Sequence, residues 1–338
     1  MRRFLDNGYV DIESIINLGM PFTFILGGRG TGKTYGTLKY VIENNISIML
    51  MRRTQSQTDL ISKPEFSPFK VLETDLKQEI NVKPVSKYSA SISKVIDDIP
   101  YLIGYTCALS TISNMRGFDA SDIEMLIYDE FIPERHERPL KNEGSAFLNA
   151  YETINRNREL KGCKPLQVIA LANSFDIANP LFMELDLVRV CEKMKNKNNN
   201  VYVNRERGVA LIFLDGSEIS KKKSETALYK LTSNNSYTEL ALDNNFVYNS
   251  TENIKSMSLK EFKPLCGIDT IYIYKHKSER LFYVSEHKSG VMPYFKNDET
   301  NINRFISKFG SFLYRRYMSN QFKFENQVAK SIFEWYII

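Results

Sequence analysis

Blocks of apolar residues separated by polar segments predict short strands and helices in residues 1–216. Brief apolar runs of the kind found in buried strands alternate with stretches whose apolar residues recur at helical spacing. The expected strands are 21–26, 46–51, 123–128, 166–171 and the last strands within 201–214, and the expected helices are 33–43 and 144–160. A strand, a glycine-rich turn, a helix and a second strand form a β-α-β unit, so the pattern predicts an α/β domain with a mostly parallel sheet.

The pattern changes after Asp215. Residues 217–250 are rich in Ser, Asn and Lys and predict a polar linker or a small lid. Aromatic, alternating runs at 270–274 and 281–284 then predict a hairpin, and 301–318 predicts a helix. We therefore expect three parts: an α/β domain at 1–216, the linker or lid at 217–250, and a small α/β domain at 251–338.

Length and composition exclude several classes of protein. A chain of 338 residues is too long for one small core, and 43% apolar with 25% charged residues is ordinary for a folded soluble protein. No uncharged apolar run approaches the roughly 18 residues that a membrane-spanning helix needs. We therefore do not expect a membrane protein. The four cysteines lack metal-ligand spacing and there are only three histidines, so we do not expect a structural zinc site either.

The positive charge is concentrated at the C-terminal end. Residues 251–338 contain 14 Lys and Arg against 9 Asp and Glu, which equals the formal charge of +5 of the whole chain and leaves residues 1–250 neutral. A basic segment on a neutral body favours a polyanionic partner such as nucleic acid, although a solvated charged face would look the same.

Residues 27–34 carry the strongest chemical signal in the chain. They match the G-x-x-x-x-G-K-[ST] phosphate loop in full and lie between an expected strand and an expected helix. Successive backbone N–H groups of such a loop surround phosphate, Lys33 neutralises the β- and γ-phosphates, and the Thr34 hydroxyl holds Mg²⁺. The nucleotide-binding residues are expected to be Gly27, Gly28, Arg29, Gly30, Thr31, Gly32, Lys33 and Thr34.

Two acidic residues follow the strand expected at 123–128. Asp129 is in the position of the carboxylate that faces Mg²⁺, and Glu130 is in the position of the residue that polarises the attacking water. The alternative is that the pair only ends a strand. The adjacent glutamate favours a hydrolase, since nucleotide kinases usually need no water-activating carboxylate there.

A cation and a polar sensor complete a triphosphate site. Arg156 and Arg158, near the end of the helix at 144–160, are candidates for the cation that stabilises charge on the γ-phosphate, often in a neighbouring subunit. The alternative is that both complement the helix C-terminus. Asn173, at the end of the strand at 166–171, is the candidate γ-phosphate sensor, or else it begins an ordinary turn.

These motifs, in this order, resemble the DNA-packaging ATPases (encapsidation proteins) of small tailed bacteriophages with protein-primed linear genomes. The resemblance covers most of the chain and is firmest between about 20 and 180. The segments that carry it are residues 27–34, 128–132, 155–159, 171–174 and 324–328.

The resemblance implies a motor of the additional-strand, catalytic-glutamate class of P-loop NTPases. Such motors form homo-oligomeric rings at the portal of a prohead in the host cytoplasm, dock there transiently, and use ATP and Mg²⁺ to drive double-stranded DNA inward. A structural packaging RNA is a further implied partner. By similarity Arg156 becomes the favoured trans-acting arginine finger, and Arg116 becomes a second trans-acting or DNA-contacting cation.

The resemblance also implies a nuclease-like C-terminal domain, which here we expect to lack nuclease chemistry. Only Asp269 and Glu286 fall beside convincing strands, and a two-metal site needs about three convergent acids. On the helix at 301–318, Arg304, Lys308 and Arg315 line one face and are candidates for contact with DNA, RNA or the portal. A solvated face is the alternative.

We therefore expect an ATPase that translocates double-stranded viral DNA. A P-loop kinase or another DNA-translocating ATPase is the first alternative, and stimulation by DNA rather than by a phosphoryl acceptor distinguishes the kinase. A nucleotide-gated, portal-binding protein with little turnover is the second alternative, against which Glu130 argues.

Overall fold

The computed structural model describes residues 1–115, 117, 119–133, 137, 140, 142–173, 177–231 and 253–337. The chain divides into two compact units, Met1–Phe246 and Val247–Ile338. The segment expected to be a linker or lid carries helices α8 (Glu218–Ser224) and α9 (Ala227–Leu231) in its described part. The rest of that segment, and Arg116, lie outside the described residues.

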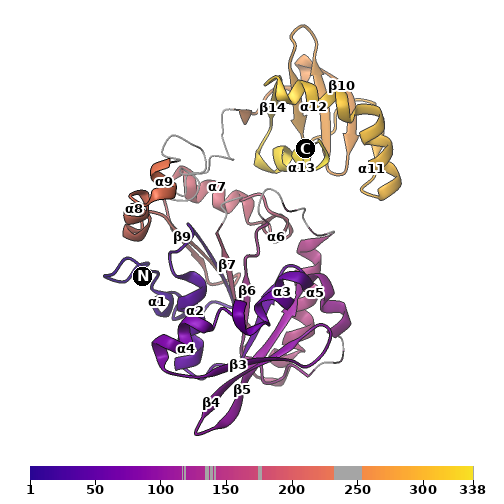
Figure 1. Ribbon diagram of the computed structural model, residues 1–338. Helices are drawn as coiled ribbons and strands as arrows, with labels where there is room; N and C mark the ends of the chain where they lie inside the picture. The colour runs from indigo at the N-terminus through magenta and orange to yellow at the C-terminus, as the bar shows by residue number, and fades with distance from the viewer. Residues whose placement is uncertain are drawn as a thin grey trace. The chain divides into compact units, whose positions relative to one another are not determined.

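The described residues of the first unit form one nine-stranded sheet (Figure 1). Its strands are β1 (Phe22–Gly27), β2 (Ile48–Arg52), β3 (Ile80–Pro84), β4 (Ala90–Ile96), β5 (Ile99–Ala108), β6 (Met125–Asp129), β7 (Gln167–Ala172), β8 (Val201–Asn204) and β9 (Val209–Leu214). Their order is β3-β4-β5-β2-β6-β7-β1-β9-β8, and the run from β5 to β9 is parallel throughout. Strand β7 lies between β1 and β6, a strand order compatible with the additional-strand class that the resemblance implies.

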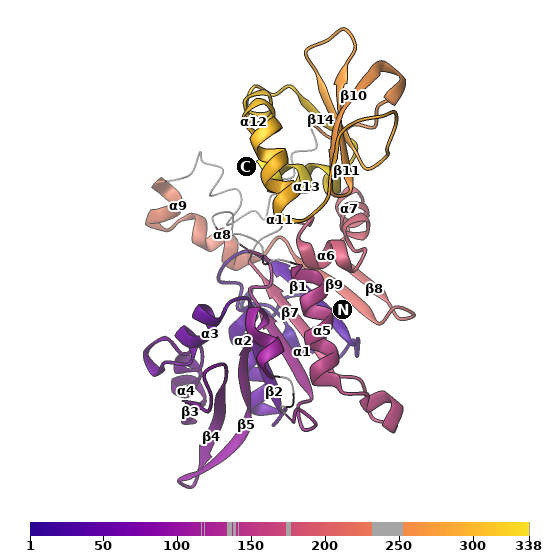
Figure 2. The same cartoon turned by 90° about the vertical axis from the view of Figure 1, so that its right-hand side faces the viewer.

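Helices cover both faces of this sheet (Figure 2). One face packs against apolar side chains of α1, α2, α3 and α4. The other face carries an aromatic cluster in which Phe24 and Tyr128 of the sheet meet Phe147 of α5 and Phe182 of α6. The helices are α1 (Ile12–Ile16), α2 (Lys33–Glu43), α3 (Gln55–Ile61), α4 (Lys70–Leu76), α5 (Glu143–Asn155), α6 (Pro180–Glu184) and α7 (Val188–Asn196). In the described part of the chain, no helix combines the length and hydropathy needed to cross a bilayer.

The antiparallel extension formed by β3, β4 and β5 was not expected from the sequence. Within it, β4 and β5 form a long hairpin that projects from the sheet, and β3 pairs with the outer side of β4 (Figure 1). Gly104 allows β5 to join the parallel core beside β2: its φ is +153°, and a Cβ at this position would collide with the carbonyl oxygen of Ile48. The sequence signal for β4 was weak, because the apolar alternation of Ala90 and Ile92 is broken at Lys94.

The helix expected at 144–160 ends earlier, at Asn155. Arg156 and Asn157 have positive φ angles of 44° and 56°, and a short 3₁₀ turn, Arg158–Lys161, follows. The Asn155 side chain accepts a hydrogen bond from the backbone N–H of Leu166 at 2.9 Å, which ties the end of α5 to the start of β7. Arg156 and Arg158 therefore do not share a helical turn.

The second unit is a smaller α/β unit whose described residues form a five-stranded sheet, ordered β13-β10-β11-β12-β14. The hairpin expected at 270–284 is confirmed, because β11 and β12 pair in antiparallel register. The strands are β10 (Phe262–Ile268), β11 (Ile271–His276), β12 (Phe282–Ser285), β13 (Tyr294–Phe295) and β14 (Phe322–Phe324), and the helices are α11 (Glu299–Phe305), α12 (Ser311–Met318) and α13 (Gln327–Ile337). A π-helical segment, Ile306–Gly310, interrupts the helix expected at 301–318.

Candidate nucleotide-binding and active site

The phosphate loop lies where a β-α-β unit places it. Strand β1 ends at Gly27 and helix α2 begins at Lys33, so the loop opens at the positive end of an eleven-residue helix. Gly30 and Gly32 have φ angles of +79° and +84°, which only glycine adopts without strain. The curled backbone and the helix N-terminus together form an anion-binding cradle.

Lys33 is buried inside this loop. Its Nζ donates to the carbonyl oxygens of Gly27 at 2.8 Å and Gly28 at 2.9 Å, so the loop backbone satisfies the ammonium group. Burial lowers the pKa of Lys33 to about 7, although the Asp129 carboxylate opposes that shift. The lysine is therefore poised to gain a full charge when an anion enters the loop.

We expect triphosphate binding to take up a proton. Phosphate charges favour the ammonium form of Lys33, whose pKa without nucleotide is about 7. Above pH 7 an increasing fraction of Lys33 is neutral in the empty site. As the pH rises, ATP affinity should therefore fall by up to about tenfold per pH unit. Calorimetry at about pH 8 in two buffers of different ionisation enthalpy measures the uptake. Binding heats that are the same in both buffers would contradict the predicted proton uptake. The Lys33→Arg variant should show no uptake, because arginine stays charged.

Thr34 and Asp129 form the second part of the site. The Thr34 hydroxyl lies 3.0 and 3.1 Å from the two carboxylate oxygens of Asp129, which is only 2% exposed. A hydroxyl and a carboxylate that meet beside the phosphate loop are the hard oxygen ligands that suit Mg²⁺. The residues present therefore fit the metal that the loop motif requires.

Glu130 and Asn173 meet at the carboxyl ends of neighbouring strands. The Asn173 amide nitrogen lies 3.4 Å from Oε1 of Glu130, because β6 and β7 are paired in parallel with Asp129 opposite Leu171. Glu130 has a φ of +57°, a conformation that costs energy in a residue other than glycine and that recurs at functional sites. The two residues are thus side by side in the active-site region, next to Asp129.

Arg52 belongs to this cluster and was missed by the sequence analysis. It ends β2, the strand next to β6, and its guanidinium lies 2.8 Å from Asp129 and 2.5 Å from Glu130. Its side chain is 11% exposed and that of Asp129 is 3% exposed, so Arg52 compensates a buried carboxylate as well as the half-exposed Glu130. The available signal was a charged residue directly after the apolar run 46–51, just as Asp129 follows its own strand.

Arg53 secures the start of helix α5. Its buried guanidinium makes two hydrogen bonds to Glu143, at 2.6 and 3.0 Å, and one to Glu137 at 3.0 Å. Glu143 begins α5 and also accepts from the backbone N–H of Leu140. Consecutive arginines thus serve two purposes: Arg52 faces the carboxylates of the site, and Arg53 fixes the start of α5.

The structure separates Arg156 and Arg158 from the rest of the site. Both lie at the amino ends of the strands: Arg158 donates to the carbonyl oxygen of Ala120 at 3.3 Å, and Arg156 lies 3.9 Å from Asp119. Asp129 is at the other end of β6, a five-residue strand about 15 Å long. Within one subunit, Arg156 therefore cannot reach a phosphate held by Lys33.

The two arginines also differ in how they are held. Arg158 makes hydrogen bonds to two backbone carbonyl oxygens, those of Asn155 and Ala120, which is the bonding of a structural side chain. Arg156 is 39% exposed, and its ion pair with Asp119 is long, between side chains that are both open to solvent. Of the two, Arg156 is the more exposed side chain.

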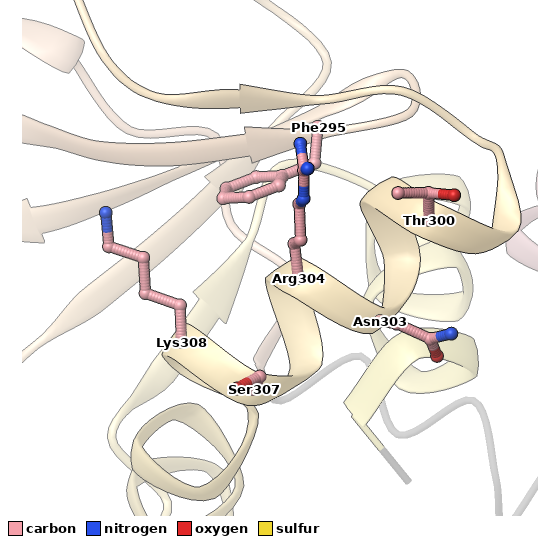
Figure 3. Close-up of a pocket in the computed structure, with 6 residues that line it drawn as sticks. All are labelled: Phe295, Thr300, Asn303, Arg304, Ser307 and Lys308. Carbon is pink, nitrogen blue, oxygen red and sulfur yellow. The ribbon is translucent and has the colours of Figure 1, made fainter.

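In the second unit, Arg304 and Lys308 line a shallow hollow of about 690 Å³ (Figure 3). Both side chains point to the same side of their helix, with the Phe295 ring beside Arg304. Arg315 is not among the lining residues and donates to Ser311 in its own helix at 3.2 Å. The π-helical segment between them changes the helical register, so the spacing that linked Arg315 to the other two does not hold.

Three acidic residues of the second unit accept hydrogen bonds from other side chains. Asp269 accepts from Tyr336 at 3.1 Å, Glu286 accepts from Asn326 at 2.6 Å, and Glu325 accepts from Ser285 at 2.7 Å. Among the residues that the structure describes, no group of three or more His, Cys, Asp or Glu side chains converges as metal ligands would.

Comparisons with known protein sequences find relatives along most of the chain. The model of a family described as podovirus DNA encapsidation protein (Gp16) matches residues 8–297. The DNA packaging protein of Bacillus phage PZA is 28% identical over 342 aligned positions, which cover 95% of this chain and 94% of that protein. The corresponding protein of Bacillus phage phi29 is 27% identical, with the same coverage.

Solved structures share the fold along nearly the whole chain. A chain of the bacteriophage Phi-29 viral genome packaging motor assembly has a TM-score of 0.62 and 20% identity, and the match covers 97% of this chain and 99% of that one. A chain of the Phi-28 DNA packaging motor has a TM-score of 0.61 and 18% identity, covering 98% and 97%. Both units of the present chain therefore fall within the matched fold.

Proposed function

Because this chain belongs to the podovirus DNA encapsidation protein family, we propose that it is the ATPase of a motor that moves double-stranded viral DNA into a prohead. One observation carries the proposal: a complete phosphate loop, Asp129, Glu130 and Asn173 all lie at the carboxyl edge of one parallel sheet. That edge combines phosphate binding, metal binding and a carboxylate able to activate water. It is the machinery of nucleoside triphosphate hydrolysis.

The roles of the residues follow from their positions. The loop 27–34 binds the triphosphate, and Lys33 neutralises its β- and γ-phosphates. Thr34 and Asp129 would hold Mg²⁺, which supplies charge neutralisation at the phosphate oxygens. Glu130 accepts a proton from the attacking water, and Asn173 orients Glu130.

The proposed motor is a homo-oligomeric ring. The support is that Arg156 lies near the amino ends of the strands, whereas the phosphate loop lies at their carboxyl ends. If Arg156 is the arginine finger, it can therefore stabilise γ-phosphate charge only in a neighbouring subunit. Each active site would then be completed by the next subunit. Arg116 remains a candidate for a second trans-acting or DNA-contacting cation.

We assign the second unit to partner binding. Its proposed fold is nuclease-like without nuclease chemistry, and its partners are DNA, a structural packaging RNA or the portal. The support is the net positive charge of 251–338 and the exposed pair Arg304 and Lys308. Docking would be transient, on a prohead in the host cytoplasm.

The test of the function is ATP turnover by the full-length protein with Mg²⁺, with and without duplex DNA. Stimulation by duplex DNA, absent in Lys33→Ala, is the expected result. Transfer of phosphate to a small-molecule acceptor would instead identify a kinase, and negligible turnover in every condition would identify a nucleotide-gated binding protein. A packaging assay with purified proheads separates the remaining alternative. If duplex DNA stimulates turnover but no DNA becomes protected from nuclease inside the proheads, the protein is another kind of translocating ATPase.

The nuclease proposal has its own test. Purified full-length protein with Mn²⁺ should leave supercoiled plasmid intact, because Asp269, Glu286 and Glu325 are engaged with separate partners. Binding of duplex DNA or RNA should weaken steeply with salt, and Arg304→Ala with Lys308→Ala should reduce it. Plasmid nicking that is lost in Asp269→Asn would show an active nuclease.

A further inference from the structure

Helix α8 is seated on the nucleotide-binding end of the first unit. Its N-cap residue, the buried Ser217, donates from Oγ to the carbonyl oxygen of Gly8 at 2.9 Å. A Cβ on Gly8 would press against the side chains of Glu218 and Ile219, so the helix is in close contact with the N-terminal segment. That segment in turn touches the phosphate loop, since Val10 donates to the carbonyl oxygen of Thr31 at 3.0 Å.

From α8, Lys223 reaches the phosphate loop itself. Its Nζ donates to the carbonyl oxygen of Arg29 at 2.8 Å. The same ammonium group lies across Gly30, where an added Cβ would collide with it. This contact joins residues 194 positions apart, and the chain between them includes every strand of the parallel core after β1.

Three cationic side chains belong to or contact the phosphate loop. Lys33 lies inside it, Arg29 is one of its residues, and Lys223 donates to the Arg29 carbonyl oxygen. Burial and the neighbouring Arg29 both lower the pKa of Lys223. A phosphate group bound beside Lys223 would offset both effects, because its negative charge favours the ammonium form.

The position along the loop indicates which phosphate Lys223 faces. Lys33, the residue that reaches the β- and γ-phosphates, donates to the carbonyl oxygens of Gly27 and Gly28, so the first residues of the loop lie at the γ end of the site. Arg29 and Gly30 follow them directly, and Lys223 lies against both.

We propose that Lys223 is a second triphosphate-binding lysine, supplied by α8, and that it exchanges the carbonyl oxygen of Arg29 for a γ-phosphate oxygen when ATP enters the loop. The proposal rests on the nucleotide site proposed above and deepens it. On this proposal, α8 is the element of the site that distinguishes a triphosphate from a diphosphate. A diphosphate has no γ-phosphate, so Lys223 would stay bound to the carbonyl oxygen of Arg29.

Nucleotide binding by the full-length protein tests the proposal. Dissociation constants for Mg²⁺-ATP and Mg²⁺-ADP are measured by calorimetry for the unmodified protein and for Lys223→Ala, Lys223→Gln, Lys223→Arg and Lys222→Ala. We expect Lys223→Ala to weaken ATP about tenfold and ADP less than about twofold, the scale of one charge-assisted hydrogen bond. Lys223→Arg should keep most of the ATP affinity. Lys222 is exposed on the same helix, and its alanine variant should bind both nucleotides normally.

Lys223→Gln separates phosphate binding from simple anchoring of α8. The glutamine amide can still donate to the Arg29 carbonyl oxygen but has no charge, so it should resemble Lys223→Ala if the phosphate contact is real. Normal ATP binding by Lys223→Gln, equal losses for ATP and ADP, or tighter ATP binding by Lys223→Ala would each overturn the proposal. If the unmodified protein bound no ATP, the proposed function would fail as well, whereas normal binding by the unmodified protein confines the failure to Lys223.

Discussion

Glu130→Gln should bind Mg²⁺-ATP with nearly the affinity of the unmodified protein and hydrolyse it about a thousandfold more slowly, within the range that general-base catalysis contributes. An amide of the same shape cannot accept a proton from water. The metal-binding residues should be undisturbed, because Thr34 and Asp129 contact each other without Glu130. Single-turnover hydrolysis measured beside nucleotide affinity separates the chemical step from binding.

Both Glu130 carboxylate oxygens have partners in the present geometry. One is paired with Arg52 and the other lies 3.4 Å from the Asn173 amide nitrogen, while 45% of the side chain stays exposed to solvent. Glu124→Gln is the matched control, since Glu124 precedes β6 at the opposite end and is exposed. Hydrolysis by Glu130→Gln at the parental rate would remove Glu130 from its assigned role.

Arg156→Ala should bind ATP normally yet lose hydrolysis by about a thousandfold or more, the effect expected for a missing arginine finger. The reason is geometric: Arg156 lies at the amino ends of the strands, beside Asp119, while its own phosphate loop is at the carboxyl ends. Its loss should leave the nucleotide pocket of the same subunit intact and impair only the site of a neighbour.

Mixing experiments test the proposed trans arrangement directly. Rings that combine Arg156→Ala with Lys33→Ala subunits should recover part of the activity, because each variant supplies at one interface what the other lacks. Arg158→Ala is the control and should cost far less catalysis, because Arg158 is bound to the carbonyl oxygens of Asn155 and Ala120. Inactive mixtures, together with lost ATP binding by Arg156→Ala alone, would assign Arg156 to its own subunit or to folding.

The phosphate loop and its strands could be predicted from the sequence because their signals are local. Eight consecutive residues specify the loop, and the apolar runs on either side specify the strand before it and the strand after α2. Helix α2 has the predicted bounds, Lys33–Glu43. Asp129 and Asn173 each follow an apolar run, and the carboxyl ends of parallel strands share one edge, so their proximity followed from the pattern as well.

Other features depend on contacts between distant residues, which no local pattern encodes. Arg52 meets Asp129 because β2 is the neighbour of β6 in the sheet, and that order is decided by packing of the whole domain. Arg156 looked like a helical neighbour of Arg158 until the tie between Asn155 and Leu166 ended α5 before either of them. The π-helical segment similarly separates Arg315 from Lys308.

The sequence by itself therefore determined which residues form the proposed site: a phosphate loop, a carboxylate proposed to face the metal and a glutamate proposed as the catalytic base, each marked by residue type and spacing. The tertiary structure alone decided which charges surround that chemistry, namely Arg52 on the carboxylates, Lys223 on the loop, and Arg156 at the opposite edge. Residue type and spacing specify local structure over a few neighbouring positions of the chain. Electrostatic partners, in contrast, depend on which residues lie close together in the folded protein. Chain order and distance in space coincide only within a single strand, loop or helix.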